Sequence, residues 1–108
     1  SVGSGKPVLN AEQPNTWALM QNHPNPFNPS TSINYNVPNG VSVPVTLKVF
    51  DIRGTHVRTL VNEVKNAGIY SVLWNGRDDA GRIVSGGIYF YRMEAGNFSQ
   101  TCKMIFLK

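Results

Sequence analysis

Catalytic chemistry in this sequence would have to come from very few side chains. The two histidines are His23, in a proline-rich segment, and His56, and the single cysteine is Cys102. Nucleophilic catalysis needs a nucleophile, a base and an orienting group brought together, and nothing in the local sequence supports such a group. We therefore expect that the chain is not an enzyme and needs no cofactor. We interpret the histidines as surface polar groups and Cys102 as a small buried residue.

One loop could supply oxygen ligands to a metal ion. Asp78, Asp79 and Asn75 lie close together in the sequence. Calcium, however, takes ~6–8 oxygens, and this loop offers few and does not match the twelve-residue calcium loop. The simpler interpretation is a solvated turn in which Asp and Asn side chains cap their own backbone, so we expect no metal site.

Aromatic side chains could instead form a platform for sugar rings. The candidates are Trp17, Tyr70, Trp74, Tyr89 and Tyr91. Trp74 is in phase with Tyr70 and Val72 along a two-residue repeat, which predicts that it faces the core. Most of these aromatics are therefore expected in the core or at its rim. A carbohydrate-binding module appended to a glycoside hydrolase stays open as an alternative function.

Composition favours a single all-β domain. The chain has 108 residues, 41% of them hydrophobic, with ten glycines and seven prolines, which is enough for one core and too few for two. The net charge is +4, but the basic residues are scattered. We therefore expect a soluble basic surface and no nucleic-acid partner. No apolar run reaches the length of about 18 residues that a membrane span needs, and a lone cysteine allows no intramolecular disulfide.

A two-residue hydrophobic repeat organises the sequence after a short linker. Residues 1–16 are rich in Gly, Ser, Pro and Asn and are interpreted as a linker or remnant, and the folded domain is expected over residues 17–108. The repeat and the turn signals between its segments predict seven strands, at 33–37, 45–49, 57–61, 70–74, 83–84, 88–95 and 98–107. Short strands at this spacing are typical of an antiparallel β-sandwich.

The last strand carries the sharpest hypothesis. Lys103–Lys108 is an apolar strand between two lysines, and the sequence ends on it with no tail. Because the sequence starts without Met and without an apolar targeting stretch, we expect a fragment cut from the C-terminal end of a longer protein. Alternation places Met104 and Phe106 in the core and leaves Ile105 and Leu107 on the opposite face. An exposed edge strand recruits another chain by strand addition. The alternative is an interior strand that is paired on both sides, and the residues alone do not decide between them.

Five segments in register resemble a known family. They are Gln21–Thr31, Val49–Gly54, Trp74–Gly81, Ser85–Arg92 and Lys103–Lys108. Together they resemble the C-terminal sorting domains of the type IX secretion system, which are related to the Ig-like domain of the flagellar hook-capping protein. The resemblance covers residues ~17 to 108, and the five segments follow one another in the same order as in the family. His23 stands where Tyr is common in the family, and Cys102 is unusual.

This resemblance implies both a fold and a function. It implies an Ig-like β-sandwich that routes an upstream cargo from the periplasm through the outer membrane. The domain is then cleaved off, or it attaches the cargo to the cell surface. The implied partner is the outer-membrane secretion machinery, with a cell-surface polysaccharide as a candidate anchor, and the domain is expected to be monomeric. The alternative is a structural scaffold like the hook cap.

The residues that would contact the partner follow from the matching motifs. They are Pro24, Asn25 and Pro26 in the proline-rich segment, Gly87 and Tyr89 in the Gly87-Ile88-Tyr89 element, and Lys103, Met104, Ile105, Phe106, Leu107 and Lys108 in the last strand.

Overall fold

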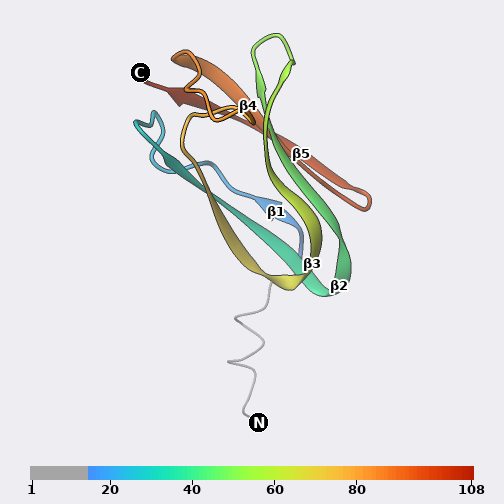
Figure 1. The fold of residues 1–108 in the computed structure, drawn as a ribbon. Coiled ribbons are helices and arrows are strands. Elements are labelled where there is room, and N and C mark those ends of the chain that lie inside the picture. Colours follow the sequence, from blue (N-terminus) through green and yellow to red (C-terminus); the bar gives the residue numbers. More distant parts are fainter. Residues whose placement is uncertain (1–14) are drawn as a thin grey trace.

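The computed structural model describes residues 15–108, and in this part of the chain the regular structure is all β (Figure 1). Its strands are β1 (Ala18–Leu19), β2 (Thr31–Asp51), β3 (His56–Trp74), β4 (Gly87–Ala95) and β5 (Phe98–Phe106). Most of the expected linker, residues 1–14, lies outside the described residues. Over the described range no helix has the length and apolar character to cross a membrane.

The frame of the molecule is one long, bent hairpin made by β2 and β3. The two strands pair antiparallel from Thr31 opposite Trp74 to Phe50 opposite His56. At the tip, the Asp51 Oδ1 atom accepts the amides of Arg53 and Thr55, each at 2.9 Å. A side-chain oxygen that accepts hydrogen bonds from nearby backbone amides stabilises a turn locally, so the turn needs no partner strand.

The bend in this hairpin converts one sheet into two layers. β1 pairs with the first half of β2, and β4 pairs with the second half, between Thr46 and Asp51. β5 then pairs with β4, which gives the strand order β1-β2-β4-β5 with β3 on the other side of β2. Figure 1 shows the sheet curled on itself, so that apolar side chains from both halves share one core. The expected all-β, Ig-like sandwich is therefore confirmed.

Over residues 15–108 the structure has five strands and not the seven expected, because two pairs of segments are each continuous, one segment is not a strand, and β1 was not among those expected. Residues 33–37 and 45–49 are both part of β2, and 57–61 and 70–74 are both part of β3. The expected turn at Pro38–Gly40 only shifts the register between Val37 and Ser42, so the chain bends without leaving the sheet. The expected strand at 83–84 is reduced to an isolated bridge between Arg77 and Ile83.

Four aromatic rings meet at one end of the core. The Phe27 ring stacks on the Phe106 ring with centroids 4.9 Å apart, and it lies 5.6 Å from the Trp74 ring. Tyr89 meets Trp74 edge to face at 5.4 Å. All four side chains are buried, as was predicted for Trp74 and Phe106. We call these four residues the aromatic cluster. It joins the proline-rich segment, β3, β4 and β5.

The aromatic cluster leaves no room for a side chain at the glycine after β3. Gly76 has φ +72°, and a Cβ atom placed there would lie 2.7 Å from the Phe106 ring. Gly81, in the following turn, also has a positive φ, of +86°, but nothing lies within 4 Å of its Cβ position. A side chain at Gly81 would therefore introduce backbone strain alone, whereas a side chain at Gly76 would introduce backbone strain and a steric clash.

We expect Gly76→Ala to destabilise the fold more than Gly81→Ala. The change at Gly81 should lower the free energy of unfolding by about 1 kcal/mol, from the left-handed backbone alone. The change at Gly76 should cost about 2–4 kcal/mol, because the new methyl group also displaces Phe106. Urea unfolding of both variants measures this difference. Equal losses would show that Phe106 is not held as described.

Candidate functional site

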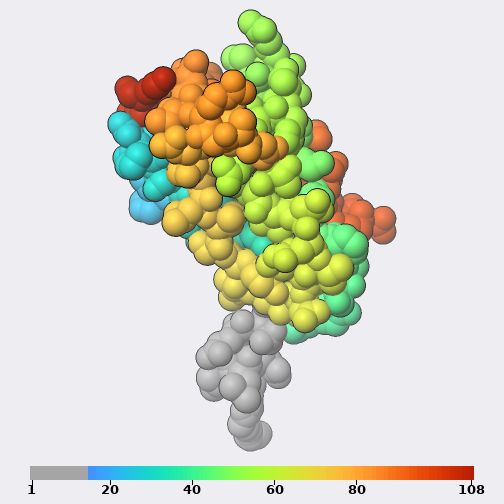
Figure 2. Space-filling view, viewed as in Figure 1, coloured from blue at the N-terminus to red at the C-terminus, as the bar shows by residue number. Residues whose placement is uncertain are grey.

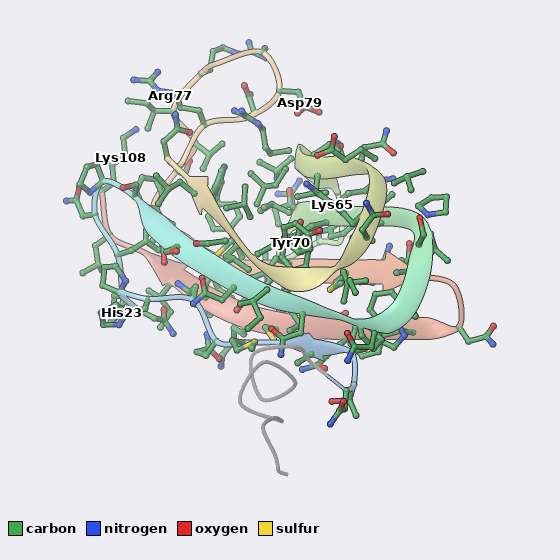
Figure 3. All side chains as sticks on the ribbon, turned by 90° about the horizontal axis from the view of Figure 1, so that it is seen from below. His23, Lys65, Tyr70, Arg77, Asp79 and Lys108 are labelled. Carbon is green, nitrogen blue, oxygen red and sulfur yellow. The ribbon has the colours of Figure 1, made fainter. Side chains whose placement is uncertain are left out.

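The three motifs singled out in the sequence meet at one end of the sandwich. In β4, Gly87 lies opposite Phe106 and Tyr89 lies opposite Met104 of β5. The proline-rich segment lies along the other edge of β5, where Phe27 forms a parallel bridge with Phe106. Figure 1 shows the end of β5 beside the loop before β2. Figure 3 places Lys108 and His23 at this same end and Lys65 and Tyr70 away from it.

The β4 side of the site depends on two adjacent glycines. Gly87 has φ +149°, in the region that L-amino acids rarely adopt. A Cβ atom on Gly86 would lie 3.1 Å from the amide nitrogen of Lys108. Next to them, the Tyr89 hydroxyl donates to the Ser85 carbonyl oxygen at 2.6 Å. Gly86 therefore leaves space for the chain after Phe106, Gly87 permits the unusual backbone conformation, and Tyr89 anchors the loop that leads to them.

The opposite edge of β5 is covered by the proline-rich segment. The Phe27 amide donates to the Ile105 carbonyl oxygen at 3.0 Å, and the Leu107 amide donates to the Phe27 carbonyl oxygen at 2.9 Å. The Ile105 amide donates to Asn25 Oδ1 at 2.9 Å, and Gln21 Nε2 donates to the Lys103 carbonyl oxygen at 2.7 Å. From Lys103 to Leu107 this edge is therefore already occupied, and strand addition there would have to displace the segment.

Of the two interpretations left open by the sequence, the structure supports part of each. The last strand has neighbours on both edges, as the interior interpretation requires. Its outward face is nevertheless not covered, because Leu107 is 53% exposed and Lys103 is also exposed. A partner can reach the side chains on this face, while the main chain near Ile105 is occupied.

A buried polar network holds the proline-rich segment in place. Asn22 is buried, and its Nδ2 atom donates to Thr31 Oγ1 at 2.9 Å and to the Pro24 carbonyl oxygen at 3.1 Å. The Thr31 hydroxyl donates to the same carbonyl oxygen at 2.9 Å. Buried polar groups must find partners inside the protein, so this network fixes the loop that carries Asn25.

The predicted contact residues divide into an exposed set and a buried set. Pro24, Asn25, Pro26, Gly87, Lys103, Leu107 and Lys108 are exposed, and Ile105 is half-buried. Tyr89, Met104 and Phe106 are buried. In the folded chain these three side chains support the site from the core and cannot touch a partner.

Sequence reasoning missed the residues that clamp the last strand. Gln21, Asn22 and Phe27 lay inside the resembling segment but were given no role of their own. The Gln21 contact with Lys103 joins residues 82 positions apart, and no short-range pattern reports such a pairing. The one signal in the sequence was a phenylalanine, Phe27, among prolines. A large apolar side chain in a loop suggests that part of the loop is buried.

The histidines and the cysteine are not brought together. His23 and His56 are exposed, as expected, and lie on different segments. His56 Nε2 lies 2.9 Å from Thr59 Oγ1. Cys102 is half-buried, not fully buried as expected, because it lies on β5 where the strand faces the short β1, with its Sγ atom 3.9 Å from the Leu19 carbonyl oxygen.

The Asp78–Asp79 loop is a turn that also covers part of β3. Asp78 Oδ1 accepts the amides of Ala80 and Arg82 at 3.0 and 2.9 Å. The hydrogen bond from the Arg82 amide is the main reason that the pKa of Asp78 lies below its usual value. Asp79 Oδ1 accepts the Thr59 amide at 3.0 Å, and Figure 2 shows this loop against the β2–β3 hairpin. In residues 15–108 no three His, Cys, Asp or Glu side chains are grouped as metal ligands would be.

The five aromatics proposed as a sugar platform do not form one surface. Trp74, Tyr89 and Tyr91 are buried. The Tyr91 hydroxyl donates to the Met20 carbonyl oxygen at 2.6 Å, and burial raises the pKa of Tyr91. Trp17 stacks on Phe98, whereas Tyr70 stacks on Tyr35. As predicted, most of these rings belong to the core or its rim.

We expect Asn25→Ala to loosen the last strand without unfolding the domain. It removes the acceptor of the Ile105 amide, so the free energy of unfolding should fall by about 1 kcal/mol. Hydrogen exchange of the Ile105 amide should accelerate more than that of the Met104 amide, which faces β4. Asn28→Ala is the matched control, because Asn28 is exposed and also precedes a proline. Equal effects of the two changes would contradict the assigned bond.

Comparison with known proteins places this geometry in a family. The sequence model of the FlgD Ig-like domain family matches residues 27–99, which is more than half of the chain. No curated protein sequence matches.

Two solved structures have a similar fold. One is dimeric latent PorU from Porphyromonas gingivalis, with a TM-score of 0.69 and 18% identity, and the similarity covers 87% of this chain and 9% of that chain. The other is FlgD from P. aeruginosa, with a TM-score of 0.53 and 28% identity, covering 70% of this chain and 58% of that chain. The two layers, the bent hairpin and the family match lead to one conclusion: the chain belongs to the FlgD Ig-like domain family.

Proposed function

We propose that this chain is a non-enzymatic sorting domain of the type IX secretion system. It directs an upstream cargo through the outer membrane and attaches it to the cell surface. The observation that carries the proposal is the meeting of three separate motifs at one end of the sandwich. These motifs, around Pro24–Pro26, Gly87–Tyr89 and Lys103–Lys108, are the ones that resemble the sorting domains. The fold shared with PorU and FlgD supports the proposal.

The geometry suits a signal that must be recognised on a folded domain. Met104 and Phe106 are buried and tie the last strand to the core, whereas Lys103 and Leu107 point into solvent. Because alternate residues of a strand face opposite sides, one short segment both stabilises the fold and presents a signal. The secretion machinery of the outer membrane would recognise the exposed side chains and not the covered main chain. The protein would then pass through the periplasm and end secreted or bound to the cell surface.

Removing Lys103–Lys108 altogether would not test recognition cleanly. Such a deletion takes Phe106 out of the aromatic cluster and leaves the Phe27 amide without its acceptor. Large-to-small changes of a buried aromatic cost about 3–5 kcal/mol, so the domain would lose stability and signal together. A single exposed residue is the better target.

We expect Leu107→Ser to reduce export of a fused reporter by about fivefold. This corresponds to a loss of about 1 kcal/mol of binding free energy, as for the minority of interface residues that dominate binding. The measurement is the extracellular fraction of the reporter in a bacterium with type IX secretion. Leu73→Ser is the matched control, because Leu73 is 66% exposed on β3, compared with 53% for Leu107. Thermal unfolding should be similar for both variants.

If the reporter joined to the unaltered chain is not exported, the proposed sorting function is wrong. If Leu107→Ser is exported as well as Leu73→Ser, then the last strand is not where the machinery binds.

Family membership favours one second candidate, a structural scaffold like the hook cap. A scaffold would self-associate or bind a filament, whereas a sorting domain is expected to be a monomer. Sedimentation of the purified chain distinguishes the two. The carbohydrate-binding alternative has less support, because three of its five aromatic residues are buried.

A further inference from the structure

The outward face of the second layer is the most distinctive unassigned surface of the described chain. Inward residues of β2, β4 and β5 alternate with outward ones, and the register aligns the outward ones in rows. One row is Lys48, Arg92 and Thr101, the next is Phe50, Phe90 and Lys103, and the last is Ile88 and Ile105. We call these eight residues the outer face.

The outer face combines apolar side chains with basic ones. Phe50, Phe90 and Ile105 are half-buried and Ile88 is 38% exposed, so an apolar strip stays in contact with water. Hollows beside the strip are lined by Ile52 and Arg53 from the β2–β3 turn together with residues of β4. A partly exposed apolar strip with charged residues around it is typical of a protein-binding surface.

Arg92 lies at the centre of the basic part and is held in a fixed place. Its guanidinium lies over the Phe50 ring, with its Cζ atom 4.6 Å from the ring centroid. Its Nε atom is 3.5 Å from Glu94 Oε2, so a carboxylate already approaches one side of the group. A planar guanidinium stacked on an aromatic ring is suited to bind carboxylates in two-point geometry.

The charges near the outer face favour an acidic ligand. Lys48, Arg53, Arg92 and Lys103 contribute four positive charges. The nearby acids are Asp51, whose Oδ1 atom accepts amides of its own turn, and Glu94, which pairs with Arg92. Electrostatic complementarity therefore selects carboxylates at the basic row.

The spacing of the rows favours an extended polypeptide as the occupant. Same-face residues on a strand lie about 6.6–7 Å apart, and the same distance separates alternate side chains of an extended peptide. A peptide lying along β4 could place a carboxylate at the Lys48–Arg92 row and apolar side chains at the Phe90 and Ile88 rows. A polyanion without apolar groups would leave the apolar strip uncovered.

We propose that the outer face binds an extended, acidic and apolar segment of a partner protein. This inference rests on the proposed function, because Lys103 and Ile105 belong to the last strand that the secretion machinery would recognise. The inference assigns the partner's chemistry, namely a carboxylate followed by aliphatic side chains on the same face of the extended segment.

The first test uses the isotope-labelled chain and synthetic peptides. A peptide of repeated Glu-Ser-Val-Ser-Val-Ser, here called the Glu/Val peptide, carries Glu, Val and Val in that order on one face when it is extended. It should shift the NMR signals of Phe90, Arg92 and Ile105. The same peptide with Lys in place of Glu tests the need for carboxylates, and the same peptide with Gly in place of Val tests the need for apolar side chains. Arg92→Gln should weaken binding of the Glu/Val peptide by about tenfold, the value of one charge-assisted hydrogen bond. Arg82→Gln, whose side chain is 81% exposed on the turn after β3 and is not part of the outer face, should change little.

Several results would overturn the inference. They are no shifts with the Glu/Val peptide, shifts at other residues, or equal binding of the version with Lys in place of Glu or of the version with Gly in place of Val. Binding of heparin at the same residues without binding of the Glu/Val peptide would assign the face to anionic polysaccharides instead.

The same two variants in the export assay separate this inference from the proposed function. Arg92→Gln should lower the extracellular fraction of the reporter and Arg82→Gln should not, with unchanged thermal unfolding in both. Export of the unaltered fusion with equal export of both variants would overturn only the inference. Failure of the unaltered fusion would overturn the sorting function, and the peptide result would still decide whether the face binds acidic segments.

Discussion

Phe27 is the residue on which the accessibility of the last strand depends. Its ring packs against those of Trp74 and Phe106, and its backbone makes hydrogen bonds to Ile105 of β5 and to Leu107 just after it. The buried ring therefore keeps the backbone of this segment on the edge of the strand. Prolines at positions 24 and 26 have no amide hydrogen to donate. The segment thus covers the edge of β5 without offering a complete new edge of its own, which protects against pairing with other chains.

Within this one strand, the residues that stabilise the core are separate from those that a partner could contact. Met104 and Phe106 point into the core, and Lys103, Ile105 and Leu107 point outward. Substitutions at the outward positions can change the affinity for a partner without disturbing the core. Substitutions at the inward positions must alter stability first. A partner that needed the main chain would have to break the contacts of Phe27, whereas one that reads side chains meets an already ordered surface. Ordered surfaces bind with less loss of conformational entropy.

Local patterns in the sequence predicted the orientation of side chains but not the connections between segments. The two-residue repeat placed Trp74, Met104 and Phe106 in the core, because alternation is a property of the strand itself. The Pro38–Gly40 segment carries the residues of a turn, yet pairing across the bend keeps both halves in one strand. Proline and glycine can serve either role, and the partner strand decides between them.

The candidate site was foreseen in its parts but not in its contacts. The motifs were recognised by resemblance, whereas the bond from the Ile105 amide to Asn25 joins residues 80 positions apart. Nothing near Asn25 in the sequence indicates that its side chain caps a distant strand.

Membership of the FlgD Ig-like family determines the fold but not the function, which depends on the residues at the surface. The same sandwich occurs in PorU and in FlgD, and a shared fold does not imply a shared task. What distinguishes one member from another is therefore the set of side chains that its strands present to water. In this chain the last strand adds Lys103 and Ile105 to a face that already holds Arg92, Phe50 and Phe90. A recognition signal carried only by the final residues would need no such face, and a purely structural strand would need no basic rows beside an apolar strip. The combination argues that the strand and the face on which it lies act as one surface.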